Sequence, residues 1–206
     1  MIHIETISNK MHDIGRVIYK NLDQNYYLAG GTALTLLSGH RESVDLDYFI
    51  QSHIDTNQLK AQLITLFPNI IITYEEKDTL WCRIDEVKLS FIHRASLLVD
   101  TPKDEEGFRI AGVGDIVVMK LNAICGREEY KDYYDLAILS EMTDVREWTT
   151  LWQKVYPHSD PLSWIVALPQ GGSCEEIKLQ GASLRSRKEV LTVLEDVTKE
   201  VTNFLK

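Results

Sequence analysis

Residues 26–50, which read YYLAGGTALTLLSGHRESVDLDYFI, constrain the fold more than any other part of the chain. An apolar, strand-like run ends at Gly30 and Gly31, a short helical segment follows, and the next strand-like run carries Asp45 and Asp47. Side chains alternate across a strand, so the two aspartates share one face, with Cα atoms roughly 6.6–6.8 Å apart. Two carboxylates this close repel each other unless a proton or a cation lies between them, and hard cations such as Mg²⁺ prefer carboxylate oxygen. The segment therefore predicts a divalent metal site on a strand.

The glycine pair predicts a phosphate-binding turn. Gly30 and Gly31 allow the backbone to turn sharply and to approach a ligand closely, and a helix with Thr32 as its N-cap offers unpaired N–H groups. His40 and Arg41, in the following loop, are further candidates for phosphate contacts, with ordinary loop positions as the alternative. A glycine turn or an Asp-x-Asp strand alone is usually structural, but the two together indicate a nucleoside triphosphate such as ATP bound with Mg²⁺ or Mn²⁺.

The remaining pattern predicts an α+β protein. A helix is expected over residues 4–20 and another over 55–67, followed by three strand-like runs that suggest an antiparallel meander. From Asp115 onward the periodicity is helical. We expect a first domain over residues 1–114, with a mixed or antiparallel sheet and flanking helices, and a mainly helical part over residues 115–206.

Charge and composition restrict the partners. The net charge of −9 disfavours DNA, so contact with RNA needs a local basic patch, for which SLRSRK (residues 183–188) is the candidate and a solvated helix start the alternative. The three cysteines are far apart, which suggests reduced thiols. No signal-peptide pattern or apolar run of ~18 residues occurs, so we expect a cytoplasmic protein without a membrane partner.

Two segments carry a family resemblance. GGTALTLLSGHRESVDLDYF, and DIVVMKLNAICGREEYKDYYDLAIL further on, resemble the AbiEii/AbiGii toxin family of nucleotidyltransferases, within the DNA polymerase β-like superfamily. The likeness covers about residues 24–140 and includes EVKLSFIH. It implies a nucleotidyltransferase-like fold whose helical second half completes the active-site cleft.

The resemblance also implies roles for individual residues. Those that bind nucleotide phosphates are Gly30, Gly31, Thr32 and Lys120, those that hold Mg²⁺ are Asp45 and Asp47, and those that form the lower part of the catalytic site are Lys131, Asp132 and Asp135. If one helix continued through the second segment, Lys120, Arg127 and Lys131 would lie within about 20° of one line and form a cationic stripe for a triphosphate. The alternatives are a solvated helix face for the cations, an N-cap role for Asp132 and a structural salt bridge for Asp135.

One position departs from the polymerase-like pattern. Such enzymes place a third carboxylate on a neighbouring strand, where this chain has Ser90. Serine is a poor base, so the proton acceptor stays open among Asp132, Asp135 and a substrate phosphate. Asp85 and Glu86, at a tight turn, are expected to be solvated.

These observations predict a Mg²⁺-dependent nucleotidyltransferase that moves a nucleotidyl group from an NTP to an acceptor hydroxyl. The family likeness implies the toxin of a toxin–antitoxin or phage-defence pair, with a cognate antitoxin as partner and the tRNA 3′ end as acceptor. Nucleotidylation of a protein hydroxyl is one alternative. A catalytically degenerate module that binds nucleotide or antitoxin without turnover is another.

Overall fold

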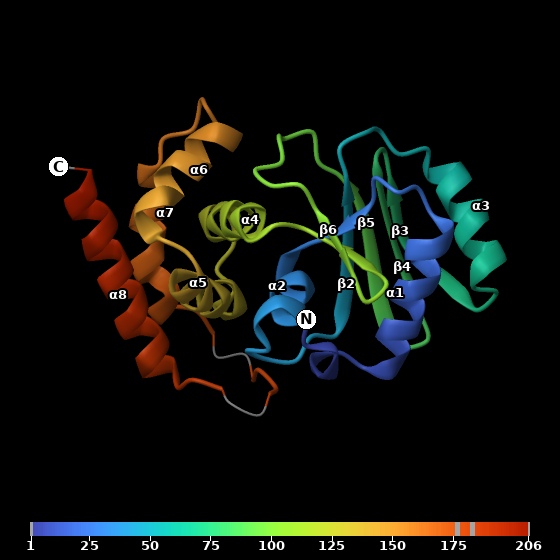
Figure 1. The fold of residues 1–206 in the computed structure, drawn as a ribbon, viewed down its shortest axis with the longest axis horizontal. Coiled ribbons are helices and arrows are strands. Elements are labelled where there is room, and N and C mark those ends of the chain that lie inside the picture. Colours follow the sequence, from blue (N-terminus) through green and yellow to red (C-terminus); the bar gives the residue numbers. More distant parts are fainter. Residues whose placement is uncertain (1, 176–177, 182–183, 206) are drawn as a thin grey trace. The chain divides into compact units, whose positions relative to one another are not determined.

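The computed structural model describes residues 2–175, 178–181 and 184–205. The chain divides into two compact units (Figure 1). Unit 1 comprises Met1–Ser96 and Pro102–Ala111, and unit 2 comprises Leu97–Thr101 and Gly112–Lys206.

Unit 1 is built on a seven-stranded sheet with the order β3-β4-β5-β2-β1-β7-β6. Its strands are β1 (Tyr27–Leu28), β2 (Asp45–Ile50), β3 (Ile70–Glu76), β4 (Thr79–Ile84), β5 (Val87–His93), β6 (Lys103–Glu105) and β7 (Phe108–Ile110). The predicted antiparallel meander is β3-β4-β5, whereas β2 pairs in parallel with β5 and antiparallel with β1. The sheet is mixed, and the α+β prediction is confirmed.

Helices α1 (Asn9–Asn21) and α3 (Thr56–Leu66) lie on one face of this sheet, and α2 (Gly30–Ser38) lies on the other side of β2 (Figure 1). Every second side chain of the central strands is buried on one face: Leu46, Tyr48 and Ile50 from β2, Leu80, Cys82 and Ile84 from β4, and Val87, Leu89 and Phe91 from β5. This alternation is the period-2 pattern of a half-covered sheet. It fixes which side chains point away from the core.

The first helix begins later than the periodicity of residues 4–20 suggests. Ile4–Thr6 form a separate 3-10 turn, and α1 begins at Asn9, after Ser8. The Ser8 hydroxyl accepts a hydrogen bond from the Met11 amide at 3.2 Å, which caps the helix.

The β6-β7 hairpin was not predicted. Its strands have three residues each, too few for a periodicity to be visible, and Glu106 and Gly107 turn the chain with φ angles of 50° and 85°. Leu28 pairs in parallel with Ile110, so this hairpin extends the sheet beyond β1.

Unit 2 is helical. It contains α4 (Val113–Gly126), α5 (Tyr130–Met142), α6 (Trp148–Val155), α7 (Leu162–Ala167), α8 (Arg187–Phe204) and the 3-10 turns Val145–Glu147 and Leu168–Gly172. Helix α6 packs through a tryptophan: Trp148 is fully buried against Trp164, with ring centroids 6.3 Å apart. The glycine-containing segment 167–183 contains the second 3-10 turn, and its residues 176–177 and 182–183 lie outside the described residues.

Across the described ranges, no helix is long and apolar enough to cross a membrane.

Two glycines provide a test of the packing. A Cβ at Gly15 of α1 would lie 2.1 Å from Cε1 of Phe108, whereas a Cβ at Gly126 of α4 would meet nothing within 4 Å. We expect Gly15→Ala to lower the free energy of unfolding by about 1–3 kcal/mol, because overpacking outweighs the better helix propensity of alanine. Gly126→Ala should leave it unchanged or raise it by up to about 1 kcal/mol. Urea unfolding followed by circular dichroism measures both, and equal stability of the two variants would contradict the packing of α1 on β7.

Candidate functional site

The glycine turn begins helix α2. Gly30 has a φ of +68°, a conformation that L side chains rarely adopt, and it is the first residue of the helix after Ala29. The N–H groups of Gly30, Gly31 and Thr32 are therefore among those at a helix start that have no partner within the helix. Such groups suit an anion such as a phosphate. The helix ends at Gly39, which is left-handed with a φ of 68°.

Thr32 is not the N-cap, and that prediction is wrong. The helix begins two residues earlier, and the Thr32 hydroxyl donates to the main-chain oxygen of Asp45. Ser43 lies 2.7 Å from the same hydroxyl and donates to it, and Thr32 is 1% exposed. The side chain thus attaches α2 to the beginning of β2, and only the backbone N–H of Thr32 is suited to a phosphate.

Asp45 and Asp47 point to the face of β2 opposite the buried face, as the alternation predicted. Asp47 lies directly opposite Ser90 of β5, whose hydroxyl donates to Oδ1 of Asp47 at 2.5 Å. The glycine turn is adjacent, because a Cβ at Gly30 would lie 3.5 Å from Oδ2 of Asp47. Unit 1 thus brings the turn, the acidic strand and Ser90 together.

The Asp45 carboxylate fits a bound cation. Its Oδ1 is buried and has no hydrogen-bond partner in the part of the chain that the structure describes. A buried carboxylate oxygen left in this state is costly, and an ion is one of the usual reasons for it. Two carboxylates on one strand face form the oxygen donor set that Mg²⁺ and Mn²⁺ prefer.

The loop cations are held by the protein itself. Arg41 is 7% exposed, and its Nη1 donates to the main-chain oxygen of Glu42 at 2.9 Å. The Nδ1 atom of His40 lies 2.7 Å from the Ser38 hydroxyl. The sequence alone suggested phosphate contacts here, and these bonds fix the loop between α2 and β2.

Lys120, Asp132 and Asp135 form a second cluster, within unit 2. The Nζ atom of Lys120 lies 2.7 Å from Oδ1 of Asp132 and 2.6 Å from Oδ2 of Asp135, and both aspartate side chains are fully buried. Arg127 adds a second cation, with Nε 2.8 Å from Oδ2 of Asp132. Asp135 therefore does form a salt bridge, and its partner here is Lys120.

The predicted cationic stripe along one helix is wrong. Helix α4 ends at Gly126, Arg127 is extended with φ −150° and ψ 149°, and α5 begins only at Tyr130. Lys131 pairs with Glu129 at 2.8 Å. Because of this break between the helices, Lys120 and Arg127 contact carboxylates of α5. The three cations do not form a line on one helix.

The pKa values follow from this network. Burial alone would lower the pKa of Lys120, but the attraction of Asp135 and Asp132 outweighs burial and raises it above its usual range. Burial alone would raise the pKa of Asp132, but Lys120 and Arg127 hold it below its usual range. Lys120 stays protonated and Asp132 stays ionised, which makes Asp132 a weak proton acceptor.

The candidate basic patch is largely used within unit 2. Arg185 makes two bonds to the Glu141 carboxylate, and Arg187 donates to the main-chain oxygens of Gly172 and Cys174. Ser183 of this patch lies outside the described residues. The contacts favour the alternative, a solvated and capped helix start.

The sequence interpretation missed an exposed row of side chains beside the aspartates. Paired residues of neighbouring strands share a face, and the pairing places Asp47, Ser90, Trp81 and Tyr74 in one row across β2, β5, β4 and β3. Trp81 is 46% exposed, Tyr74 is 42% exposed, and their ring centroids are 4.9 Å apart. The alternation in TLWCRID, which sets Trp81 opposite the buried Leu80 and Cys82, was the signal for it.

A second row lies next to the first. Asp45 pairs with Lys88, and Lys88 pairs with Arg83. Lys88 and Arg83 are exposed, so two cations lie one and two strands away from the acidic strand, on the same face as the aromatic pair.

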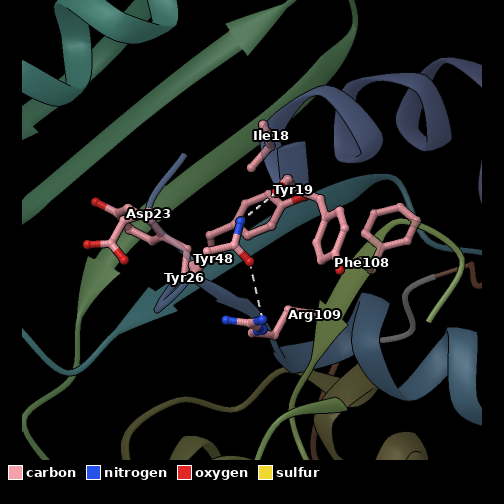
Figure 2. Close-up of a pocket in the computed structure, with 8 residues that line it drawn as sticks. Ile18, Tyr19, Asp23, Tyr26, Tyr48, Phe108 and Arg109 are labelled. Atoms are coloured by element: carbon pink, nitrogen blue, oxygen red, sulfur yellow. Dashed lines mark hydrogen bonds between the residues drawn. The ribbon is translucent and has the colours of Figure 1, made fainter. Parts of the chain in front are cut away.

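A small pocket lies on the face of β2 that carries Tyr48, opposite Asp45 and Asp47 (Figure 2). It is too small to be a substrate site. Its lining residues include Tyr26, Tyr48, Phe108 and Arg109, and its volume is about 10 Å³, enough for about one water molecule. The buried Tyr48 hydroxyl has no hydrogen-bond partner among the described residues, and one water would satisfy it.

Two lysines eleven positions apart test the buried cluster. Lys120→Met leaves two buried carboxylates without their ammonium partner, so we expect it to lower the free energy of unfolding by about 3–5 kcal/mol. Lys131→Met removes a half-exposed pair with Glu129 and should cost less than about 1 kcal/mol. Denaturant unfolding of both variants at one ionic strength measures the difference, and equal stabilities would contradict a structural role for Lys120.

Comparison with known proteins gives the family. The model of the family described as "Nucleotidyl transferase AbiEii toxin, Type IV TA system" matches residues 16–163. An uncharacterized protein of Aquifex aeolicus (strain VF5) is 35% identical over 151 residues, which cover 70% of this chain and 73% of that protein.

Solved structures share the fold. A Helicobacter pylori protein, JHP933, superposes with a TM-score of 0.53 at 20% identity, covering 98% of this chain and 96% of that chain. MenT4, a nucleotidyltransferase toxin from Mycobacterium tuberculosis H37Rv, superposes with a TM-score of 0.50 at 16% identity, covering 94% of this chain and 86% of that chain. The match over more than half of the sequence, together with this shared fold, establishes that the chain belongs to the AbiEii nucleotidyl transferase toxin family and is a nucleotidyltransferase.

Proposed function

We propose that the protein transfers a nucleotidyl group from a Mg²⁺-bound nucleoside triphosphate to a terminal hydroxyl of RNA, with the tRNA 3′ end as the leading acceptor. One observation carries the metal part of this proposal: Oδ1 of Asp45 is buried without a hydrogen-bond partner in the described part of the chain, on the same strand face as Asp47. Membership of a type IV toxin–antitoxin family implies an NTP substrate and an antitoxin partner.

Different residues of unit 1 bind the phosphates and the cation. The N–H groups of Gly30, Gly31 and Thr32 bind phosphate oxygens, and Asp45 and Asp47 hold the cation. Ser90 fixes the orientation of Asp47 through the hydrogen bond to Oδ1. The cation, when bound, polarises the α-phosphate and neutralises the pyrophosphate that leaves. Arg41 supports the loop through its bond to Glu42 and is proposed as a further phosphate contact.

The transfer forms a bond between the acceptor oxygen and the α-phosphorus and breaks the bond from that phosphorus to the bridging oxygen of pyrophosphate. The hydroxyl proton needs an acceptor, and Ser90 is a poor one. The lowered pKa of Asp132 and the bonds of Asp132 and Asp135 to Lys120 favour positioning roles for these residues. We therefore propose that a phosphate oxygen of the substrate accepts the proton.

Unit 2 carries, within itself, the second cluster of predicted site residues. Lys120 keeps its charge because two carboxylates hold it, and the family resemblance assigns it to the triphosphate. Lys131, more exposed and paired with Glu129, is the weaker candidate for a catalytic role.

The open sheet face supports a nucleic-acid acceptor. Trp81 lies two strands from Asp47 in the same row, about 10 Å away at the usual strand spacing, and Tyr74 lies one strand further. Exposed aromatic rings next to Lys88 and Arg83 combine stacking with attraction of a phosphate backbone, as single-stranded nucleic-acid surfaces do. A protein hydroxyl as acceptor is the second candidate, favoured only by the overall negative charge of −9.

Isosteric substitutions test the metal ligands. We expect Asp45→Asn and Asp47→Asn each to lower nucleotidyl transfer by at least about 100-fold, since loss of even an outer-shell partner of a metal site costs 10–100-fold. Asp85→Asn, at an exposed turn of the same sheet, is the matched control and should retain activity. Labelled NTP with total RNA and total protein as acceptors gives the rate and the destination of the label, and Mn²⁺ binding followed by electron paramagnetic resonance tests the ligands directly. Full activity of both aspartate variants would overturn the proposal.

The aromatic row gives a separate prediction. We expect Trp81→Ala to raise KM for the RNA acceptor by about 5- to 150-fold with little change in KM for the NTP, because stacking on one base contributes about 1–3 kcal/mol. Trp81→Phe should restore most of the affinity. Ile71→Ala, an exposed position on the same sheet that lacks an aromatic ring, is the control. An unchanged KM for RNA in Trp81→Ala, or label found in protein and not in RNA, would remove the RNA surface from the proposal.

A further inference from the structure

Three metal-ligating side chains meet in unit 1 away from the aspartates of β2. They are His53, in the loop after β2, Asp78, between β3 and β4, and His93, the last residue of β5. One donor atom from each lies within 4.8 Å of the others. Ile50, the last residue of β2, is already about 10 Å beyond Asp47 along the strand, and His53 lies further on. The cluster is therefore separate from the proposed nucleotide site.

The backbone presents Asp78 in a fixed orientation. Asp78 is left-handed, with a φ of 61°, which is uncommon for a residue with a side chain. Its Oδ1 accepts from the Ile54 amide at 2.8 Å, and its main-chain oxygen accepts from the His93 amide at 3.0 Å. These two bonds leave Oδ2 directed to the imidazoles, 2.8 Å from Nδ1 of His53 and 3.8 Å from Nδ1 of His93.

The second nitrogen of His93 is fixed as well. Its Nε2 lies 3.1 Å from the main-chain oxygen of Gln51, and because a carbonyl oxygen only accepts, Nε2 carries the hydrogen. A metal would then be bound through Nδ1, which lies on the side of Asp78. Metal-bound histidines almost always donate their other N–H to a carbonyl or carboxylate in this way, and their carboxylate co-ligands are hydrogen-bonded too.

The distances suit a small transition metal. In a tetrahedral zinc site with bonds of 2.0–2.2 Å, neighbouring ligand atoms lie about 3.3 Å apart. The two measured distances to Oδ2, 2.8 Å and 3.8 Å, lie on either side of that value. The donor atoms of the two histidines lie within 4.8 Å of each other. His53 can adjust its position because its side chain is 77% exposed.

From this geometry we propose that His53, Asp78 and His93 bind one divalent transition metal, with zinc as the leading candidate, and that solvent fills the remaining coordination position. Two imidazoles and one carboxylate favour Zn²⁺, Co²⁺ or Ni²⁺ over Mg²⁺. The bound metal would clamp the loop after β2 to the β3-β4 turn and to the end of β5. The protein then carries two chemically different cation sites, and the second does not depend on the proposed nucleotidyl transfer.

Zinc titration of the untagged, chelator-treated full chain tests the site. Millimolar Mg²⁺ is kept in the buffer so that the oxygen ligands of β2 are occupied. We expect about one zinc per chain in isothermal titration calorimetry, a higher Tm with zinc, and visible absorption of four-coordinate type with Co²⁺. Asp78→Asn keeps the left-handed turn and the Ile54 bond, and it should weaken zinc binding by at least about 100-fold, as should His93→Gln.

Two control variants complete the experiment. His158→Gln changes an exposed histidine of unit 2, and Cys125→Ser removes the exposed thiol, so both should bind zinc as the unchanged chain does. The proposal is overturned if micromolar zinc gives no saturable binding, if binding survives both Asp78→Asn and His93→Gln, or if Cys125→Ser abolishes it. Circular dichroism confirms that each variant folds, and nucleotidyl transfer by Asp78→Asn with Mg²⁺ should match that of the unchanged chain.

Discussion

Burial of negative charge is the constraint on which the arrangement of this protein depends. A carboxylate removed from water must gain a proton, a cation or several hydrogen bonds. Helix α5 buries Asp132 and Asp135 and neutralises them with Lys120, while Arg127 adds a further bond to Asp132. Strand β2 leaves Oδ1 of Asp45 without a partner among the residues described. The charges of the first cluster are balanced within the chain, whereas the proposed partner of Asp45 Oδ1 is a bound cation.

One face of the sheet of unit 1 forms the core, and the other carries the proposed functional residues. One set of alternating side chains forms the core under α1 and α3, and the other set carries the aspartates, Ser90, two cations and an aromatic pair. A single strand register therefore positions both the core and the proposed acceptor surface. A one-residue slip of β2 would bury Asp47 and expose Leu46 and Tyr48, so the register itself is strongly specified.

Local signals predicted much of this architecture. The helix over residues 55–67 and the alternation of β2 could be predicted because each depends on neighbouring residues only. The β6-β7 hairpin could not, since strands of three residues show no period. The cationic stripe failed because a helix was extended across Gly126, and the partners of Lys120 come from a different helix. Thr32 matched an N-cap by residue type, but a contact with Asp45 decided its role. The His53, Asp78 and His93 cluster joins positions 25 and 15 residues apart, which no local pattern links.

The buried network in unit 2 also affects how sequence motifs of this kind are interpreted. Changing Lys120 alone leaves two buried carboxylates without a charge partner, and changing either aspartate alone leaves the charges unbalanced. Substitutions at these three positions are therefore expected to occur together. A descendant that lost its enzymatic role would still lose stability if one of the three residues changed alone. Asp45, whose Oδ1 has no hydrogen-bond partner among the described residues, would be the first of these residues to be substituted. The presence of Lys120, Asp132 and Asp135 therefore indicates a shared fold. The presence of Asp45 and Asp47 is the better indicator that a related protein has kept enzymatic activity.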